Sequence, residues 1–352
     1  MAHPTKPLIL LYPQPPNSSE KVIFPSDSGT MALSSFGPAS VLSVSGSGED
    51  VFAYFPVTNG SNSGLCCIWE KMILKQFWAV DQGEAVVNCW WLSGNPRQMV
   101  TDQSGRPKRL PRLGPELAIH STLALILMED FTLQLVCESS NPSKPDGPFD
   151  IVTASALRRT THGTTKRPKG MNPYTGYICT RASLGLGYND STILVAMQAS
   201  LLPPPCLPLS ETRFAGLGIP AATFITQPSN DDWEYTGTES AIRICEVSVA
   251  RTSEKGWDIQ TEPLSPIAHK MSAQLMHLQF VPKLHNESSA MSVDGTSQSD
   301  RYLVVATTEF GLFASTPKTE VSVYSLSKES GSSSTSKWNV HMESSRTFTE
   351  HA

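Results

Sequence analysis

The side chains in this sequence that are best suited to catalysis or metal binding are its eight histidines, and their spacing argues against both roles. His120 and His277 fall in expected strands and His162 in an expected loop, and none has a partner at metal-ligand spacing. The patterns H-x-x-x-H, G-x-S-x-G and H-x-E…C-x-x-C do not occur, so common zinc and serine-hydrolase signatures are missing. The sequence therefore predicts no catalytic residue and no metal site.

Two glycine-containing segments match phosphate-binding loops only in part. Gly185-Leu-Gly187 supplies two of the three glycines of a dinucleotide fingerprint, without the strand–turn–helix context. Residues 45–48, Ser-Gly-Ser-Gly, lack the Lys-Ser/Thr of a phosphate loop. The acidic run at residues 231–234 contains Trp233, which favours a solvated loop with an aromatic anchor over a metal site. We therefore expect no cofactor, no small-molecule substrate and no enzymatic activity.

Two basic clusters contrast with a chain whose net charge is −5. The first occupies residues 106–112, and the second consists of Arg158, Arg159, Lys166, Arg167 and Lys169. Prolines in both segments favour extended, accessible loops. Either cluster is compatible with an ordinary solubilising loop, but paired basic residues followed by Lys-Arg-Pro-Lys make the second a candidate nuclear-import signal.

Composition narrows the class of protein. A pI near 5.9 argues against wholesale nucleic-acid binding, and no run approaches the ~20 apolar residues of a membrane-spanning helix. The seven cysteines are odd in number, lie mostly in apolar runs and form no C-x-x-C pair. This pattern favours reduced, buried thiols in an intracellular protein.

The pattern of strands is clearest at residues 51–92. Four short runs rich in β-branched and aromatic residues, at 51–55, 65–69, 76–80 and 85–92, are separated by Asn/Gly/Asp turns. We expect one meander of four antiparallel strands. Because both of its faces are apolar, it needs cover on both sides, which is the situation of a propeller blade.

Similar strand steps return along the chain. We expect the first and second strands of a blade to pair at 87–93 with 97–102 and at 275–282 with 302–308. We expect the second and third strands of a blade to pair at 121–128 with 132–138, at 192–198 with 241–249 and at 302–308 with 320–326. Fourth strands are expected at 76–80, 257–262 and 338–342, and surface-loop insertions at 103–116, 141–170, 201–239 and 283–300. The expected fold is all-β, a WD40-like β-propeller with degenerate blades and long loop insertions, with closure of the ring left open. A β-sandwich or two small β-domains are the alternatives.

This interpretation divides the chain into three parts. Residues 1–50 would hold strands at 8–12 and 30–36 and a Ser/Gly-rich loop at 40–50. The propeller would span residues 51–343, and residues 344–352 would form a polar C-terminal tail.

Three phrases of the sequence carry a family resemblance. They resemble the fungal form of Mediator of RNA polymerase II transcription subunit 16, and they are VFAYFP at 51–56 followed by GLCCIW at 64–69, QFWAV at 76–80 with residues 83–92, and ASLGLGYNDSTILVAMQ at 182–198. The resemblance is strongest over residues 51–198. Members of that family are usually longer, with a helical region after the propeller.

The resemblance implies a non-catalytic scaffold in the tail module of a nuclear transcriptional coactivator, without cofactors. Its partners would be other Mediator tail subunits and transcriptional activators, which it helps relay to RNA polymerase II. Charge and the lack of a long apolar run lead us to expect no direct sequence-specific contact with nucleic acid and none with membranes. Two alternatives remain open: a WD40-type adaptor of another intracellular complex and, less favoured, a propeller enzyme whose ligands come from several blades.

Overall fold

The structure is a computed structural model that describes residues 9–11, 21–23, 36–58, 64–71, 73–80, 84–92, 99–101, 105–115, 122–139, 147–163, 177–188, 190–201, 241–252, 256–268, 273–283, 301–309, 316–329 and 337–349. These residues form strands β1 to β21, and they contain no helix. The prediction of an all-β chain is confirmed.

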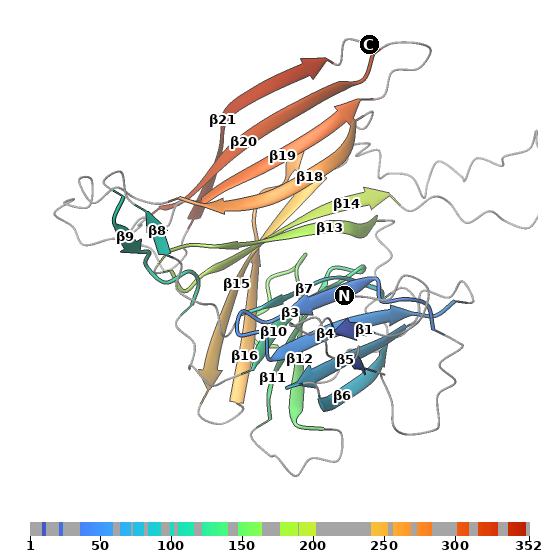
Figure 1. Ribbon diagram of the computed structural model, residues 1–352. Helices are drawn as coiled ribbons and strands as arrows, with labels where there is room; N and C mark the ends of the chain where they lie inside the picture. Colours follow the sequence, from blue (N-terminus) through green and yellow to red (C-terminus); the bar gives the residue numbers. More distant parts are fainter. Residues whose placement is uncertain are drawn as a thin grey trace, which may run out of the picture.

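Four antiparallel meanders, each built from four strands in chain order, make up the body of the molecule (Figure 1). The first sheet contains β3 (Val41–Val44), β4 (Asp50–Pro56), β5 (Gly64–Glu70) and β6 (Ile73–Val80), and the second β7 (Val86–Trp91), β10 (Leu123–Met128), β11 (Thr132–Glu138) and β12 (Phe149–Ser155). The third contains β13 (Tyr177–Leu186), β14 (Ile193–Leu201), β15 (Ala241–Thr252) and β16 (Gly256–Pro263), with the short β17 (Ile267–Ala268) on β15. The fourth contains β18 (Ala273–Pro282), β19 (Arg301–Glu309), β20 (Lys318–Glu329) and β21 (Lys337–Thr349).

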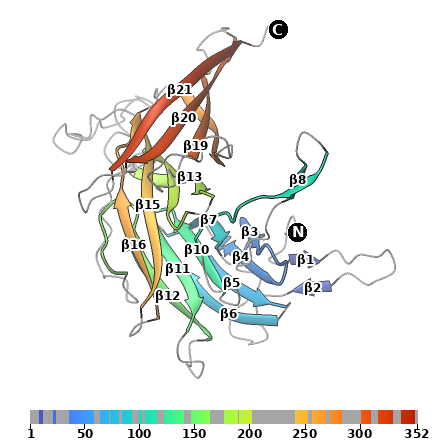
Figure 2. The same cartoon turned by 90° about the vertical axis from the view of Figure 1, so that its left-hand side faces the viewer.

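Two hairpins lie outside these sheets. β1 (Ile9–Leu11) pairs with β2 (Lys21–Ile23), and β8 (Met99–Thr101) pairs with β9 (Pro107–Arg109). In Figures 1 and 2 the β1–β2 hairpin lies on the side of the first sheet that faces away from the second.

The four sheets stack face to face, and alternation along a strand fills both interfaces. On β10, Leu125 and its odd-numbered neighbours pack toward the third sheet, whereas Ile126 and the even-numbered residues pack toward the first. β14 divides in the same way, with Val195 toward the second sheet and Leu194 toward the fourth. The first strand of each sheet lies beside the first strand of the next, as β3, β7, β13 and β18. The sheets therefore fan out from one line of neighbouring strands.

An Asp-x-Thr turn shows how local chemistry sets a strand junction. Between β10 and β11, the Asp130 carboxylate accepts hydrogen bonds from the Thr132 backbone N–H at 3.0 Å and hydroxyl at 2.9 Å. Phe131 between them has a φ of 64°, which is unusual for an aromatic residue, and its side chain is buried. The Asp130 bonds and this burial stabilise the turn together.

Several strand predictions are confirmed. The second-to-third steps all pair as expected, as β10–β11, β14–β15 and β19–β20, and the first-to-second step at 275–282 pairs as β18–β19. The expected fourth strands lie in β6, β16 and β21, and β1 covers most of the strand expected at 8–12. The strand expected at 30–36 lies outside the described residues except for Phe36, which forms an isolated bridge with Val57.

Other boundaries were wrong. The run at 85–92 does not complete the first meander, because β7 pairs with β10 and opens the second sheet. The missing strand of the first sheet is β3, inside the segment expected as a loop at 40–50, where Val41 pairs with Tyr54 and Val44 with Val51. Its Ser/Gly-rich surroundings hide a short Val-Leu-Ser-Val strand.

The insertions and the tail also need correction. The strand expected at 97–102 pairs in the β8–β9 hairpin, not with β7, and β9 lies in the insertion expected at 103–116. The loop expected at 141–170 contains β12, the edge strand of the second sheet. β21 extends to Thr349, so most of the expected polar tail at 344–352 is strand, because its polar residues pair along β20 at a solvent-exposed edge. The insertions at 201–239 and 283–300 lie almost wholly outside the described residues.

Candidate interaction surface

The glycines that resemble a dinucleotide fingerprint allow two sheets to approach closely. A Cβ added at Gly185 on β13 would lie 2.6 Å from the Phe280 ring on β18, and one at Gly187 would lie 3.1 Å from the Arg301 guanidinium. Both positions lie where the third sheet meets the fourth. Their role is packing, which accounts for the glycines without a nucleotide.

The segment at 45–48 is a tight turn between β3 and β4. The Ser45 hydroxyl accepts a hydrogen bond from the Asp50 N–H at 3.0 Å, the Gly48 N–H donates to the Ser45 carbonyl at 2.9 Å, and Gly48 has a φ of 77°. These polar groups of the turn are therefore hydrogen-bonded to one another and to the first residue of β4. The acidic run at 231–234 lies outside the described residues.

The six described cysteines are buried and form no disulfide bonds. Burial raises the pKa of the Cys245 thiol to about 12 and the pKa of Cys66, Cys67, Cys89 and Cys179 well above the usual thiol value. These five side chains therefore behave as small apolar groups rather than nucleophiles.

Two further kinds of feature are absent from the described part of the chain. No group of three or more His, Cys, Asp or Glu side chains there is arranged to hold a metal ion. Nor do those residues include a helix long and apolar enough to cross a bilayer.

Only the first pair of the candidate import cluster lies in the described residues. Arg158 and Arg159 lie in a segment that runs along β16, where Thr160 and Thr261 exchange backbone hydrogen bonds of 2.9 and 3.0 Å. The Arg159 guanidinium forms a 2.8 Å ion pair with Glu262, and both side chains are about half exposed. Lys166, Arg167 and Lys169 lie outside the described residues, so nuclear import stays a prediction.

Asp258 on β16 binds the end of the same segment, at His162 and Gly163. The Asp258 carboxylate meets His162 Nδ1 at 2.9 Å and accepts the Gly163 N–H at 2.8 Å. Burial alone would raise the pKa of Asp258, but hydrogen bonds from His162, Gly163 and Ile259 outweigh it and lower that pKa. The contacts join the end of the second sheet to the edge of the third.

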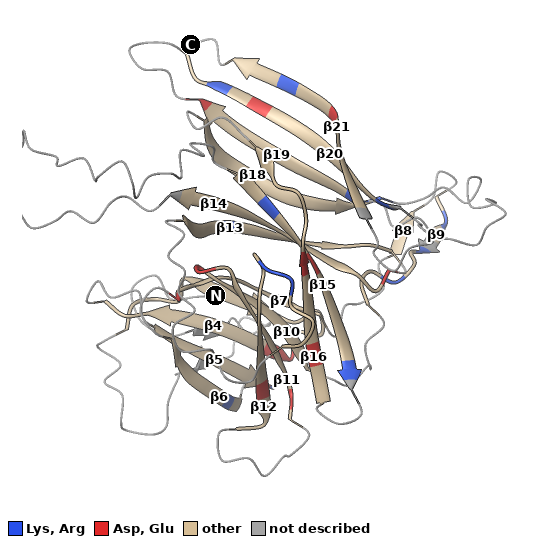
Figure 3. Ribbon diagram, turned by 180° about the vertical axis from the view of Figure 1, so that it is seen from behind, with Lys and Arg blue, Asp and Glu red and all other residues tan. Residues whose placement is uncertain are grey.

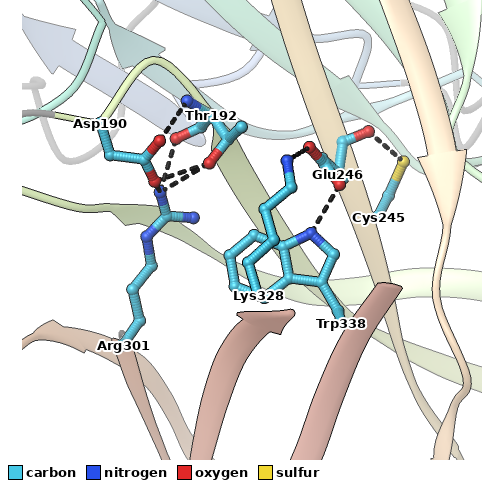
Figure 4. Close-up of polar contacts among 7 residues, drawn as sticks. All are labelled: Asp190, Thr192, Cys245, Glu246, Arg301, Lys328 and Trp338. Atoms are coloured by element: carbon cyan, nitrogen blue, oxygen red, sulfur yellow. Dashed lines mark hydrogen bonds and ion pairs between the residues drawn. The ribbon is translucent and has the colours of Figure 1, made fainter. Parts of the chain in front are cut away.

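A buried polar cluster joins the third sheet to the fourth (Figure 4). Arg301, at the start of β19, is fully buried, and its Nη2 donates to the Asp190 carboxylate, to the Thr192 carbonyl at 2.6 Å and to the Thr192 hydroxyl at 3.1 Å. Asp190 also accepts the Thr192 N–H and hydroxyl, at 3.0 and 2.6 Å, in a second Asp-x-Thr turn. Burial lowers the pKa of Arg301 to about 10, opposed by Asp190 and Glu246.

The second half of this cluster centres on Glu246 of β15. Its carboxylate accepts hydrogen bonds from Lys328 Nζ at 2.7 Å and from Trp338 Nε1 at 2.5 Å. The Arg301 Cζ and the Lys328 Nζ lie 5.5 and 5.6 Å from the Trp338 ring centroid, within cation–π range. Geometry of this kind selects one orientation of the fourth sheet against the third, because a misplaced sheet would leave buried charges unpaired.

Among the described residues, no further sheet covers the other face of the fourth sheet. Along β19, buried Arg301, Leu303 and Val305 alternate with partly exposed Tyr302 and the neighbours that follow it. By contrast, every residue of β10 is buried. On the open face Val304 pairs with Val323 and Ala306 with Val321, and Phe348 of β21 is 55% exposed. We name this set, with Tyr302, the open face.

Comparison with known proteins adds no relative: neither a scan against protein-family models nor a search of curated proteins finds a match to this chain.

Sequence reasoning missed both the open face and the Arg301 cluster. Arg301 and Asp190 are 111 residues apart, and neither stands in a charged motif. The one available signal was the repeated Asp-x-Thr pattern at 130–132 and 190–192, which marks two strand starts.

Proposed function

We propose that the four sheets are blades of a WD40-like β-propeller and that the chain is a non-catalytic scaffold that holds other proteins. Two features support the propeller: each meander runs in chain order, and the first strands of successive meanders lie side by side. The apolar interfaces between consecutive sheets agree with the packing expected of blades.

We further propose that the assembly it serves is the tail module of the Mediator coactivator in the nucleus, where it relays activators to RNA polymerase II. The family resemblance is the support for this assignment. Two of the phrases that carry it lie in β4 and β5, in the second half of β13 and in most of β14, which are strands of the sheets rather than loops.

The observation that carries the scaffold role is the open face. The three existing sheet–sheet interfaces bury apolar alternation on both sides, and the fourth sheet presents the same alternation with no further described sheet against it. Continuity with those interfaces supports the proposal that a further β-sheet of the assembled complex covers this face. We therefore assign it to assembly.

Affinity purification of the tagged full chain from nuclear extract, with mass spectrometry, tests the assignment. We expect other Mediator tail subunits to be recovered with the wild type and to be lost with Val304→Lys/Val323→Lys. Arg243→Glu, at an exposed position of β15, is the matched control and should leave recovery unchanged. Recovery of a different complex would favour the WD40-type adaptor, and the absence of tail subunits would overturn the Mediator assignment.

A further inference from the structure

The β8–β9 hairpin stands away from the four sheets. It is inserted between the first two strands of the second sheet, and Figures 1 and 2 both show it extending outward from the body. Its base is nevertheless anchored, because Leu110 is buried, Leu113 bridges to Tyr188, and the Gly114 N–H donates to the Gly187 carbonyl at 2.9 Å. The hairpin is thus held in a defined place with its strands in solvent.

Both faces of this two-stranded ribbon carry an exposed apolar side chain. Met99 is 60% exposed and Val100 is 39% exposed, and neighbouring residues on a strand point to opposite faces. A lone hairpin in water is marginally stable at best. Contact with another molecule would both cover these side chains and stabilise the ribbon.

Basic residues accompany the apolar ones. Arg106, Lys108, Arg109 and Arg112 fall within residues 105–115, which contain no acidic residue, on a chain whose net charge is −5. Figure 3 shows basic residues on β9, and Arg106 and Arg109 are exposed. Met99 pairs directly with Arg109 across the two strands, so an apolar and a cationic side chain share one face.

We propose that this hairpin binds acidic protein segments in which carboxylates alternate with apolar side chains. Guanidinium groups bind carboxylates through paired, charge-assisted hydrogen bonds, and the adjacent Met99 would receive the apolar side chain. The inference rests on the proposed function as a protein scaffold and names the class of partner.

Nucleic acid fits the same observations less well. A phosphate backbone offers nothing apolar to cover Met99 and Val100, and the described strands of the hairpin carry no aromatic residue on which a base could stack.

Fluorescence anisotropy with the purified full chain tests the proposal. The probe is a short labelled peptide in which Asp and Glu alternate with Leu and Phe, compared with an Asp/Glu/Ser peptide and with a labelled DNA duplex. We expect the first peptide to bind more tightly than the other two, and Arg109→Glu to weaken it by about tenfold, because it places like charges together. Met99→Ser should weaken it about threefold through lost apolar contact.

Matched substitutions elsewhere separate local from general effects. Arg251→Glu, exposed on β15, and Met342→Ser, 52% exposed on β21, should leave peptide affinity unchanged. Because the hairpin stands off the body, thermal unfolding of Arg109→Glu should match the wild type. Equal loss in the controls, no binding of the peptide, or tighter binding of the duplex would each overturn the proposal. Recovery of tail subunits by the same variants is scored separately, so either idea can fail without the other.

Discussion

The first and fourth sheets lie at the two ends of the stack, and they treat their outer faces differently. On the first sheet, the face turned away from the second carries Phe55 and Trp69, both fully buried. On the fourth, the corresponding face carries Tyr302 and Val304, which are partly exposed. The outer face of the first sheet buries large aromatic side chains, whereas the open face of the fourth sheet leaves Val304 and its β-branched neighbours, together with the aromatic Tyr302, partly exposed.

The inner attachments of these end sheets differ as well. The first sheet meets the second through a cluster of apolar side chains around Phe52 and Ile126. The fourth meets the third through a smaller apolar cluster supplemented by the Arg301, Asp190 and Glu246 contacts. Apolar burial stabilises a contact without fixing the relative orientation of the two sheets. Buried charge pairs fix that orientation, but they cost desolvation free energy. The fourth sheet is therefore the end whose placement is specified most closely.

The largest effect is expected at the covered end. Trp69→Ala should lower the free energy of unfolding by about 3–5 kcal/mol, because it removes a fully buried indole from the outer face of the first sheet. Its indole N–H has no hydrogen-bond partner among the described residues, so Trp69→Phe should lower the free energy of unfolding much less. Urea unfolding followed by circular dichroism measures both, and a near-neutral Trp69→Ala would contradict the burial of this face.

Arg301→Ala should lower the free energy of unfolding by about 3 kcal/mol, measured in the same way. The substitution leaves the largely buried Asp190 carboxylate without its cation and removes the joint between the third and fourth sheets. The double variant Arg301→Met/Asp190→Asn should recover part of the loss, because no unpaired charge remains. An equal or larger loss in the double variant would show that packing, not charge, is decisive.

Asp258→Asn, at the contact between the second and third sheets, should lower the free energy of unfolding by about 1 kcal/mol. The pKa of Asp258 is lower in the folded state than its unfolded value of about 3.9, so its stabilisation is present above that pH and lost as pH falls through the folded pKa. Unfolding of wild type and variant at neutral pH and at about pH 3 tests this. The difference in unfolding free energy between wild type and variant should be smaller in acid than at neutral pH. A larger difference in acid would contradict the assignment.

The smallest effect is expected at the open end. Val304→Ala should change the unfolding free energy of the isolated chain by about 0.5 kcal/mol or less, because its side chain is only partly buried. The same substitution should weaken recovery of partners. A cost comparable to that of a core valine would mean that the face is already covered.

Local pattern predicted most strands but not their allocation to sheets. Runs such as 123–128 and 193–201 are apolar enough to be recognised alone, and their turns carry Asp or Gly. Period-two alternation does not say which neighbour a strand pairs with, so β7 was placed in the first sheet although it opens the second. The Asp-Gln-Gly sequence at 81–83 is typical of a hairpin, but the strands on either side of it, β6 and β7, belong to different sheets.

The interaction surfaces were predictable to different degrees. The basic run at 106–112 was visible in the sequence, whereas its place on a projecting hairpin was not. The open face could not be foreseen, because exposure of Val304 depends on what stacks above it and not on its own strand. The same holds for Arg301, whose burial depends on Asp190 in another sheet.

Hydrogen–deuterium exchange on the chain alone and in the recovered complex tests the central claim most directly, namely that the fourth sheet is the assembly end of a scaffold. We predict slow exchange on β10 and β14 in both states, and a fall in exchange on β20 and β21 when partners are bound. Unchanged exchange on β20 and β21 in the complex would contradict this account.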